Sequence, residues 1–340
     1  IMSSTLRLDD PSDAREAASE FKQVHDAVHT EVARMMVGQE SVIDGVLSAL
    51  FAGGHVLLEG VPGLGKTLLV SSISNAVDLS FRRIQFTPDM MPADIRGTNV
   101  LTEDGTGGTK LEFQPGPLVA NLILADEINR ATPRTQSALL ESMQEKQISV
   151  GNRTIVLDEP FCVMATQNPI EQEGTYPLPE AQLDRFLFKL SVGYPAEEDY
   201  RTIIRRTTAN EEIKLKAVTD AETVVRLRQV VRAIPLPEHV ETEAIRIVMA
   251  TQPGSEYAPN IVDEVVALGA SPRGVQGLIL AGKVRALLEG RFAVAGEDLR
   301  AVALDVLRHR VLVNFQGMSE GISPDKVITE VLAVVPTVEG

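Results

Sequence analysis

Short runs of consecutive apolar residues, separated by helical patterns, dominate the chain between His55 and about Val192. Because these runs do not alternate with polar residues, they predict strands that are buried on both faces of a parallel sheet. We therefore expect an α/β fold built on a five-stranded parallel sheet. The expected strands are His55–Glu59, Arg83–Phe86, Leu122–Ala125, Phe161–Ala165 and Phe186–Val192.

Helical periodicity marks the two ends of the chain. Apolar residues at helical spacing predict two helices between about Ala14 and Leu50, with a break at Val37–Glu40. After Tyr194-Pro195 the pattern is helical to the end, so we place a domain boundary there. Residues 1–194 would form the α/β core, and residues 195–340 an all-α domain. Its expected helices are Val224–Ala233, Glu241–Ala250, Ile261–Leu268, Val275–Leu288, Gly296–Leu312 and Lys326–Val335.

Two further segments of the core alternate in the way that β-hairpins do. The first lies between Ile95 and Pro115, with turn-forming residues from Glu103 to Gly108. The second joins Gln147–Val150 to Thr154–Leu157 around Gly151-Asn152. A glycine-containing turn between two short runs favours a hairpin in each case.

The segment Gly60–Thr67 has the pattern of a phosphate-binding loop, and it stands between an expected strand and an expected helix. Its glycines let backbone N–H groups turn inward, and the helix N-terminus adds partial positive charge. We predict that it binds a nucleoside triphosphate, with Lys66 at the β- and γ-phosphates and the Thr67 hydroxyl on Mg²⁺. The alternative is a glycine-rich turn without a ligand. The candidate binding residues are Gly60, Val61, Pro62, Gly63, Leu64, Gly65, Lys66, Thr67 and Leu68.

Two adjacent carboxylates, Asp126 and Glu127, follow the apolar run Leu122–Ala125. In a parallel sheet, ligands gather at the carboxyl ends of the strands, where the phosphate-binding loop also lies. Asp126 would hold the Mg²⁺ shell, and Glu127 would polarise the attacking water. The alternative is an acidic turn that caps the next helix, although Thr132-Pro133 already supplies the start of that helix.

Three more polar residues are candidates for nucleotide chemistry. Asn168 follows the fourth expected strand and either contacts the γ-phosphate and water or caps a turn before Pro169. Arg185 either pairs with Asp184 or projects to a neighbouring subunit, where a guanidinium would stabilise phosphoryl transfer. Arg273 stands in the first turn of an expected helix, where the dipole disfavours a cation. Either a bound phosphate compensates the charge of this arginine, or its side chain is solvated at the surface.

Composition limits the partners and the location. The formal net charge of −15 over 340 residues, with no basic run interleaved with aromatic residues, makes nucleic acid an unlikely partner. No apolar run approaches the roughly 20 residues that cross a bilayer, and the N-terminal residues are polar. We therefore expect a cytoplasmic protein that does not insert directly into a membrane. The single Cys162, within an apolar run, is expected to be buried and inert.

Taken in their order along the chain, the motifs resemble those of the AAA+ ATPases and, within them, the MoxR family. The resemblance covers roughly Val32 to Leu312. The matching segments are Val37-Gly38-Gln39, Gly60–Thr67, Asp126–Arg130, Ala165–Pro169, Leu183–Phe186 and Ser271–Arg273.

The resemblance implies a role for each of these segments. Val37 and Gly38 would line the adenine pocket, and Asn168 would be the sensor 1 residue. Arg185 would be the arginine finger that acts on a neighbouring subunit, with Arg130 and Arg134 as alternatives. Arg273 would be the sensor 2 residue on a C-terminal lid. The first hairpin would be the helix-2 insert at a central pore, and the second the pre-sensor-1 insert.

The resemblance also implies a magnesium-dependent ATPase that forms a hexameric ring with ATP at the subunit interfaces. Such proteins are chaperones that remodel client complexes or insert cofactors or metals, usually with a von Willebrand factor A-domain partner. ATP would fix the lid against the core through Arg273 and recruit Arg185 from the next subunit. Hydrolysis at Glu127 would then release that arrangement.

Other functions share a phosphate-binding loop. A ring motor acting on nucleic acid would need basic residues on the pore hairpin, where Lys110 is the only nearby cation. A nucleotide switch would show negligible turnover. A small-molecule kinase does not account for the helical domain and the paired hairpins.

Overall fold

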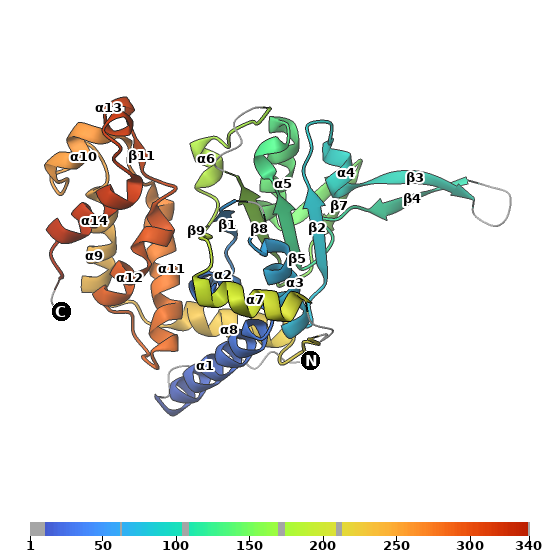
Figure 1. Cartoon of the computed structure of the whole chain (residues 1–340), viewed down its shortest axis with the longest axis horizontal. Helices are drawn as coiled ribbons and strands as arrows, with labels where there is room; N and C mark the ends of the chain where they lie inside the picture. Colours follow the sequence, from blue (N-terminus) through green and yellow to red (C-terminus); the bar gives the residue numbers. More distant parts are fainter. Residues whose placement is uncertain (1–10, 62, 104–108, 169–173, 209–212, 339–340) are drawn as a thin grey trace.

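The computed structural model describes residues 11–61, 63–103, 109–168, 174–208 and 213–338 of the chain (Figure 1). A five-stranded parallel sheet lies at its centre, which confirms the expected α/β fold. In spatial order the strands are β2 (Phe81–Gln85), β5 (Leu122–Asp126), β8 (Cys162–Gln167), β1 (Val56–Glu59) and β9 (Phe188–Ser191). The predicted binding residue Pro62, as well as Pro169 and the turn at 104–108, lies outside the described residues.

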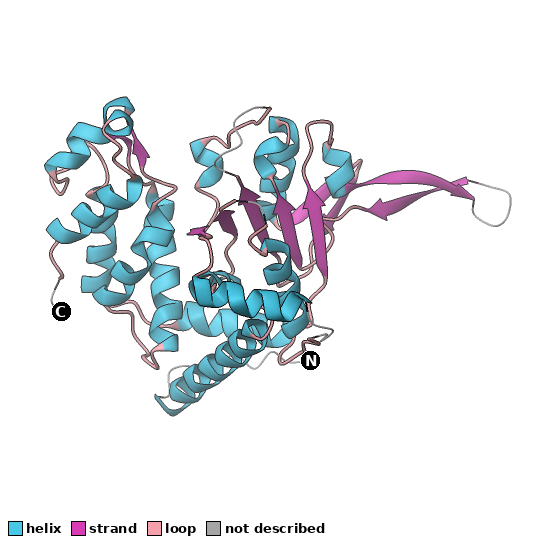
Figure 2. Cartoon of the chain, in the orientation of Figure 1, coloured by secondary structure: helices cyan, strands magenta, loops and turns pink. Residues whose placement is uncertain are grey.

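Both faces of the sheet are covered by helices, as Figure 2 shows. Since successive strand residues point to opposite faces, Leu58 and Leu124 belong to one core and Leu57 and Ile123 to the other. The first core also contains residues of α1 (Pro11–Ala33), α2 (Glu40–Ala52) and α3 (Lys66–Ala76). The second core lies against α5 (Pro133–Glu145), which begins after Thr132. The apolar runs of the three inner strands, β5, β8 and β1, thus form strands that are buried on both faces.

The edge strand β2 departs from this rule. Its residues Arg82 and Arg83 are exposed, so the prediction of burial on both faces is wrong for this strand. The reason is its position, since β2 is one of the two outermost strands and has a neighbour on one side only; the other outermost strand, β9, likewise leaves Ser191 exposed. Arg83 is thereby free to reach a polar group on β5.

The two expected hairpins are confirmed. Strands β3 (Gly97–Glu103) and β4 (Thr109–Pro115) follow α4 (Pro92–Arg96) and project away from the body (Figures 1 and 2). Strands β6 (Gln147–Val150) and β7 (Arg153–Val156) form the second, shorter hairpin directly after α5.

The C-terminal part is helical, as predicted, with one short two-stranded addition. The prediction is wrong at Val266–Leu268 and Leu312, where the chain is extended and forms β10 (Val266–Leu268) and β11 (Leu312–Val313). The backbone leaves helical geometry at Val266, and antiparallel pairing with β11 then satisfies its polar groups. The remaining helices are η1 (Ile128–Arg130), α6 (Glu180–Leu183), α7 (Glu197–Thr208), α8 (Ala221–Ala233), α9 (Glu238–Met249), α10 (Asn260–Val265), α11 (Pro272–Leu288), α12 (Gly296–Leu307), α13 (Phe315–Ser319) and α14 (Pro324–Val334).

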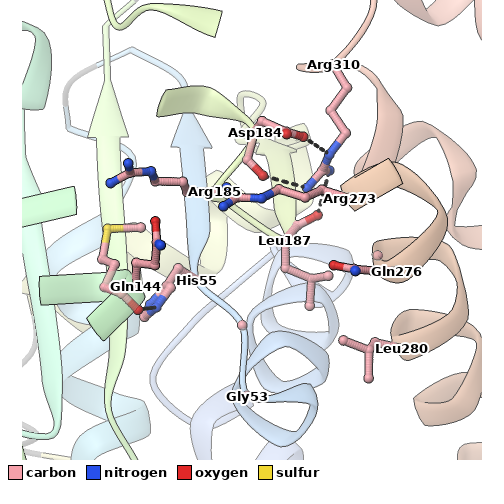
Figure 3. A pocket seen from close by; sticks show the side chains of 13 residues that line it. Gly53, His55, Gln144, Asp184, Arg185, Leu187, Arg273, Gln276, Leu280 and Arg310 are labelled. Carbon is pink, nitrogen blue, oxygen red and sulfur yellow. Dashed lines mark hydrogen bonds and ion pairs between the residues drawn. The ribbon is translucent and has the colours of Figure 1, made fainter. Parts of the chain in front are cut away.

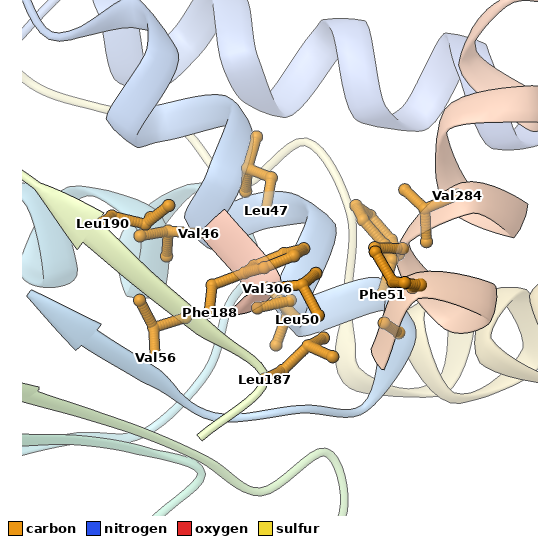
Figure 4. Packing of buried hydrophobic residues seen from close by; sticks show 14 of the residues in the cluster. Val46, Leu47, Leu50, Phe51, Val56, Leu187, Phe188, Leu190, Val284 and Val306 are labelled. Atoms are coloured by element: carbon orange, nitrogen blue, oxygen red, sulfur yellow. The ribbon is translucent and has the colours of Figure 1, made fainter. Parts of the chain in front are cut away.

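A continuous apolar core joins the helical part to the sheet. Figure 4 shows Phe51 of α2 near Val284 of α11, and Leu187 near Val306 of α12. Helix α8 packs against both α2 and α11. The boundary at residue 195 therefore stays a prediction, because the core crosses it without a break.

Two smaller features bear on the chemistry. Cys162 is fully buried, burial raises the pKa of its thiol to about 12, and its Sγ donates to the Gly54 carbonyl at 3.2 Å. The thiol is therefore inert, as predicted. In the part of the chain that the structure describes, no helix is both long and apolar enough to cross a membrane.

Candidate functional site

The loop between β1 and α3 needs its glycines for two different reasons. Gly63 and Gly65 have φ values of 86° and 77°, in the left-handed region that favours glycine. Gly60 is needed for space, because a Cβ there would lie 2.6 Å from the Val192 carbonyl oxygen. The loop thus lies against Val192, directly after β9, and turns into the N-terminus of α3 at Lys66, where backbone N–H groups lack intrahelical partners.

A cavity of about 360 Å³ lies over this loop and brings together half of the predicted site residues. The loop meets the acidic pair and the amide of Asn168 there, because β1, β5 and β8 end at one edge of the sheet. The lining residues are Gly63, Gly65, Lys66, Thr67, Leu68, Arg83, Asp126, Glu127, Thr166 and Asn168.

The donor set of the cavity fits a magnesium ion. The hydroxyl of Thr67 and the carboxylate of Asp126 both line it, and hard divalent cations prefer such oxygen ligands. The same wall carries Lys66, whose Nζ donates to the Gly60 carbonyl at 2.6 Å. Burial lowers the pKa of Lys66, and the carboxylates of Asp126, Glu127 and Glu59 oppose that shift.

A threonine that the sequence analysis missed joins the carboxylate of Asp126 to the backbone of Glu127. Thr166 is 1% exposed; its hydroxyl donates to Asp126 Oδ1 at 2.6 Å and accepts the backbone N–H of Glu127 at 2.8 Å. Glu127 takes the left-handed conformation, with φ of 57°, which turns its side chain away from the strand. The signal was Thr166's place at the end of β8, two residues before Asn168.

Two residues of β2 donate hydrogen bonds to the carboxylates of Asp126 and Glu127. The sequence analysis did not predict either residue. Arg83 Nη2 and Nε donate to Asp126 Oδ2 at 2.5 and 3.1 Å. Gln85 Nε2 donates to Glu127 Oε2 at 2.8 Å, and Arg130 Nη1 donates to the same oxygen at 3.2 Å. Arg130, an alternative for the finger, thus pairs within its own chain, whereas Arg134 is exposed at the start of α5.

An adjoining cavity of about 520 Å³ shares Gly63, Gly65 and Leu68 with the first. Its largely apolar lining beside a phosphate-binding loop suits a flat, uncharged ring such as a nucleobase. The other lining residues are Met35, Met36, Val37, Gln39, Leu64, Tyr194, Pro195, Tyr200, Ile203, Arg206, Thr207 and Ile213.

Among the described residues, three predicted members of the base pocket and the phosphate-binding loop line neither cavity. Gly38, a predicted contact of the base, is one of them, and a Cβ there would clash with Asp199 Oδ2, so its contribution is space for α7. The other two are Gly60 and Val61, which were predicted as parts of the phosphate-binding loop. Val37 and Leu64 do line the second one.

The predicted arginines Arg185 and Arg273 lie together, but not at the phosphate-binding loop. They line a separate groove of about 230 Å³ beside His55 and Gly53, as Figure 3 shows. His55 directly precedes β1, whereas Gly60 follows it. The groove and the loop therefore lie at opposite edges of the parallel sheet, the groove where the strands begin and the loop where they end. The length of β1 alone separates these edges by about 13 Å.

Within one chain, neither arginine therefore lines the nucleotide cavity. Arg273 stands at the start of α11, at the far edge of the sheet from its own phosphate-binding loop, so the expectation that ATP between subunits fixes the lid through Arg273 stays a prediction. Arg185 does not reach its own site either, which agrees with a residue that acts on another chain.

Comparisons with known proteins agree with this architecture. The family model described as "ATPase family associated with various cellular activities (AAA)" matches residues 55–188, and the "AAA lid domain" model matches residues 258–331. Chaperone MoxR1 of Mycobacterium tuberculosis is 44% identical over 325 residues, which cover 96% of this chain and 85% of that protein. Protein MoxR of Methylorubrum extorquens is 33% identical over 98% of this chain and 99% of its own length.

A solved structure extends the likeness to the fold. A crystal structure from Cytophaga hutchinsonii, provisionally described as that of an ATPase, superposes with a TM-score of 0.90 at 39% identity. It covers 97% of this chain and 99% of its own. Fold and site together define an ATPase of the AAA+ class with a nucleotide-binding core and a lid. The chain belongs to the MoxR family of these ATPases.

Proposed function

We propose that this chain is an ATP-driven chaperone that remodels or assembles client protein complexes, including the insertion of cofactors or metals. The observation that carries the proposal is the cavity in which Lys66 and Thr67 face Asp126 and Glu127. The similarity to a protein named as a chaperone supports the cellular role. A von Willebrand factor A-domain partner and a cytoplasmic location are parts of the proposal that rest on the family alone.

The side chains of the cavity divide the reaction among themselves. Lys66 and the N–H groups at the start of α3 neutralise the β- and γ-phosphates. Mg²⁺, when held by Thr67 and Asp126, supplies further charge neutralisation at the phosphate oxygens. Glu127 orients the attacking water and polarises it, while Gln85 and Arg130 fix its carboxylate. Asn168, at the end of the adjacent strand, lies within the same cavity and contacts the γ-phosphate.

A second chain completes the site in this proposal. Arg185 and Arg273 lie at the sheet edge opposite to their own loop, so they serve a nucleotide bound by a neighbour. Closed rings of identical subunits repeat such a head-to-tail contact at every interface. We therefore propose a hexameric ring with ATP hydrolysed at the subunit interfaces.

The projecting hairpin favours a protein client over nucleic acid. Leu101 and Leu111 lie opposite each other on β3 and β4 and are 72% and 56% exposed. Within the described residues of this hairpin, Lys110 is the only basic side chain, and it pairs with Glu112 at 3.3 Å. A surface of this kind attracts phosphates weakly and offers apolar contacts instead.

The variant Glu127→Gln tests the catalytic assignment. It keeps the shape of the side chain and removes its charge, so kcat should fall by at least about a hundredfold while ATP still binds. Glu330→Gln, an exposed position on α14, is the matched control and should leave kcat unchanged. Unaltered turnover in Glu127→Gln would remove this residue from its role. Strong salt-sensitive stimulation of turnover by DNA or RNA would instead favour the ring motor.

A further inference from the structure

One carboxylate connects the two arginines of the groove. Asp184 directly precedes Arg185 in the chain, and its Oδ2 accepts a hydrogen bond from Ser271 Oγ at 2.8 Å. The same Ser271 hydroxyl caps α11 by accepting the backbone N–H of Arg273 at 3.1 Å. The two arginines thus come from distant parts of the sequence but are joined through a short path of hydrogen bonds.

A buried arginine of the lid holds this path in place. Arg310 is 7% exposed and donates through Nε to Asp184 Oδ1 at 2.8 Å (Figure 3). Its other nitrogen atoms donate to backbone carbonyls of the core, those of Asp184 at 3.2 Å, Phe186 at 2.7 Å and Leu187 at 3.2 Å. The Val306 carbonyl in the lid accepts from it as well. A single planar guanidinium therefore fixes the backbone on which Arg185 stands.

The neighbouring residue reinforces this contact. His309 is fully buried, and its Nε2 lies 2.9 Å from the Phe186 carbonyl, which also accepts from Arg310. Burial lowers the pKa of Arg310, and the Asp184 carboxylate opposes the shift, so the guanidinium keeps its charge where it bonds the carboxylate. Several hydrogen bonds therefore join the turn after α12 to the segment before β9.

Charge is not balanced within this group. Three arginines, Arg185, Arg273 and Arg310, line the groove together with a single carboxylate, that of Asp184, and Arg310 occupies that carboxylate. In the described parts of the chain, the guanidinium groups of Arg185 and Arg273 make neither an ion pair nor a hydrogen bond, and both are partly exposed. Two unpaired cations that line one groove repel each other, and their fixed backbones keep them there. Such a pair is suited to an anion that carries several charges.

We propose that Arg310 and Asp184 form a clamp that holds Arg185 and Arg273 as one preformed unit for the terminal phosphates of ATP on a neighbouring subunit. This inference rests on the proposed function, since it requires nucleotide at an interface between chains. Arg310 is a positioning residue, because it acts through the backbone and the carboxylate of Asp184. Preformed donors avoid reorganisation when negative charge develops, which gives the clamp its effect on rate.

Mixed assemblies of full-length chains test the clamp. The acceptor chain carries Arg185→Ala and Arg273→Ala and keeps its own nucleotide cavity. The donor chain carries Lys66→Ala and keeps both arginines. Mixing acceptor and donor should restore ATP hydrolysis. Adding Arg310→Gln to the donor should lower the restored rate by about ten- to a hundredfold, since misplacement by about 1 Å has effects of that size.

Two controls separate positioning from loss of fold. Arg300→Gln in the donor removes another lid arginine with several hydrogen bonds, which donates to Glu243 and to the Leu332 and Val335 carbonyls and does not touch the clamp. It should leave the restored rate within about twofold. Asp184→Asn, which preserves shape, should act like Arg310→Gln and serves if that variant fails to fold. Arg310→Gln placed in the acceptor should have little effect, because the acceptor has no arginine pair to position.

The outcomes are distinct. Restored hydrolysis that withstands both Arg310→Gln and Asp184→Asn in the donor would overturn the clamp and leave the proposed function intact. An equal loss with Arg300→Gln would also overturn it, because the effect would then be general weakening of the lid. If the unmodified donor and acceptor show no restoration at all, the site shared between chains fails, and the clamp fails with it.

Discussion

Lowering the pH tests how much the buried His55, which directly precedes β1, contributes to stability by its hydrogen bonds to helix α5 and to the sheet. His55 Nδ1 accepts the backbone N–H of Val163 at 3.0 Å, so the ring proton lies on Nε2, which donates to the Met143 carbonyl at 3.0 Å. Burial lowers the pKa of His55 from 6.5 to about 4, the Met143 carbonyl opposes the shift, and the cations Arg228 and Lys146 add to it. Protonation of Nδ1 would break the bond to Val163 and place a charge in the core.

The magnitude follows from the two pKa values. Between them the unfolded chain binds more protons than the folded chain, so the stabilising effect of neutral His55 is complete above pH 6.5 and decreases as the pH falls toward about 4. Integrated from pH 7.5 to pH 5, this one residue removes about 2 kcal/mol from the free energy of unfolding.

Urea denaturation at pH 7.5 and pH 5 measures this loss. The variant His55→Gln keeps a donor and an acceptor but does not titrate, so its loss between the two pH values should be smaller by about 2 kcal/mol. His309, whose pKa is also lowered by burial, is present in both proteins, and its effect cancels. His239→Gln, at a partly exposed position on α9, is the matched control. Equal losses in the original protein and in His55→Gln would refute the reasoning.

Other predictions concern the site itself. Thr166→Val removes the hydroxyl that joins Asp126 to Glu127, so ATP turnover should fall by at least about tenfold, whereas Thr166→Ser should restore most of it; equal rates in both variants would contradict the bridge. Gly60→Ala forces its Cβ against the Val192 carbonyl and should lower the free energy of unfolding by about 1–3 kcal/mol in urea titrations. Gly193→Ala, whose Cβ would meet nothing within 4 Å, should stay within about 0.5 kcal/mol, and a similar loss in both would show that close approach is not the cause.

The parts of the fold that were predictable depend on local sequence. The inner strands β1, β5 and β8 begin with continuous apolar runs, and the loop Gly60–Thr67 has a spacing that backbone geometry dictates. The edge strand β2 shows the limit, because its exposed Arg83 depends on which strand happens to be outermost. The short strands β10 and β11 were missed for a similar reason, since pairing between distant segments ended two helices early.

The site was predictable in its residue types and less so in its arrangement. Lys66, Asp126 and Asn168 meet because strands that end at one edge must bring their ends together. The position of Arg273 depends instead on how the lid docks, through contacts such as Arg310 to Asp184, which lie 126 residues apart in the sequence. No periodicity or motif states which sheet edge a lid will contact. Sequence could therefore identify the arginine but not the edge at which it lies.

Binding of a non-hydrolysable ATP analogue, measured by calorimetry in the presence of magnesium, tests the central claim most directly. The protein should bind one analogue per chain, and Lys66→Ala should weaken that binding by more than about tenfold, since it removes the ammonium group that faces the phosphates. Unchanged affinity in a folded Lys66→Ala protein, or no binding by the original protein, would contradict the account.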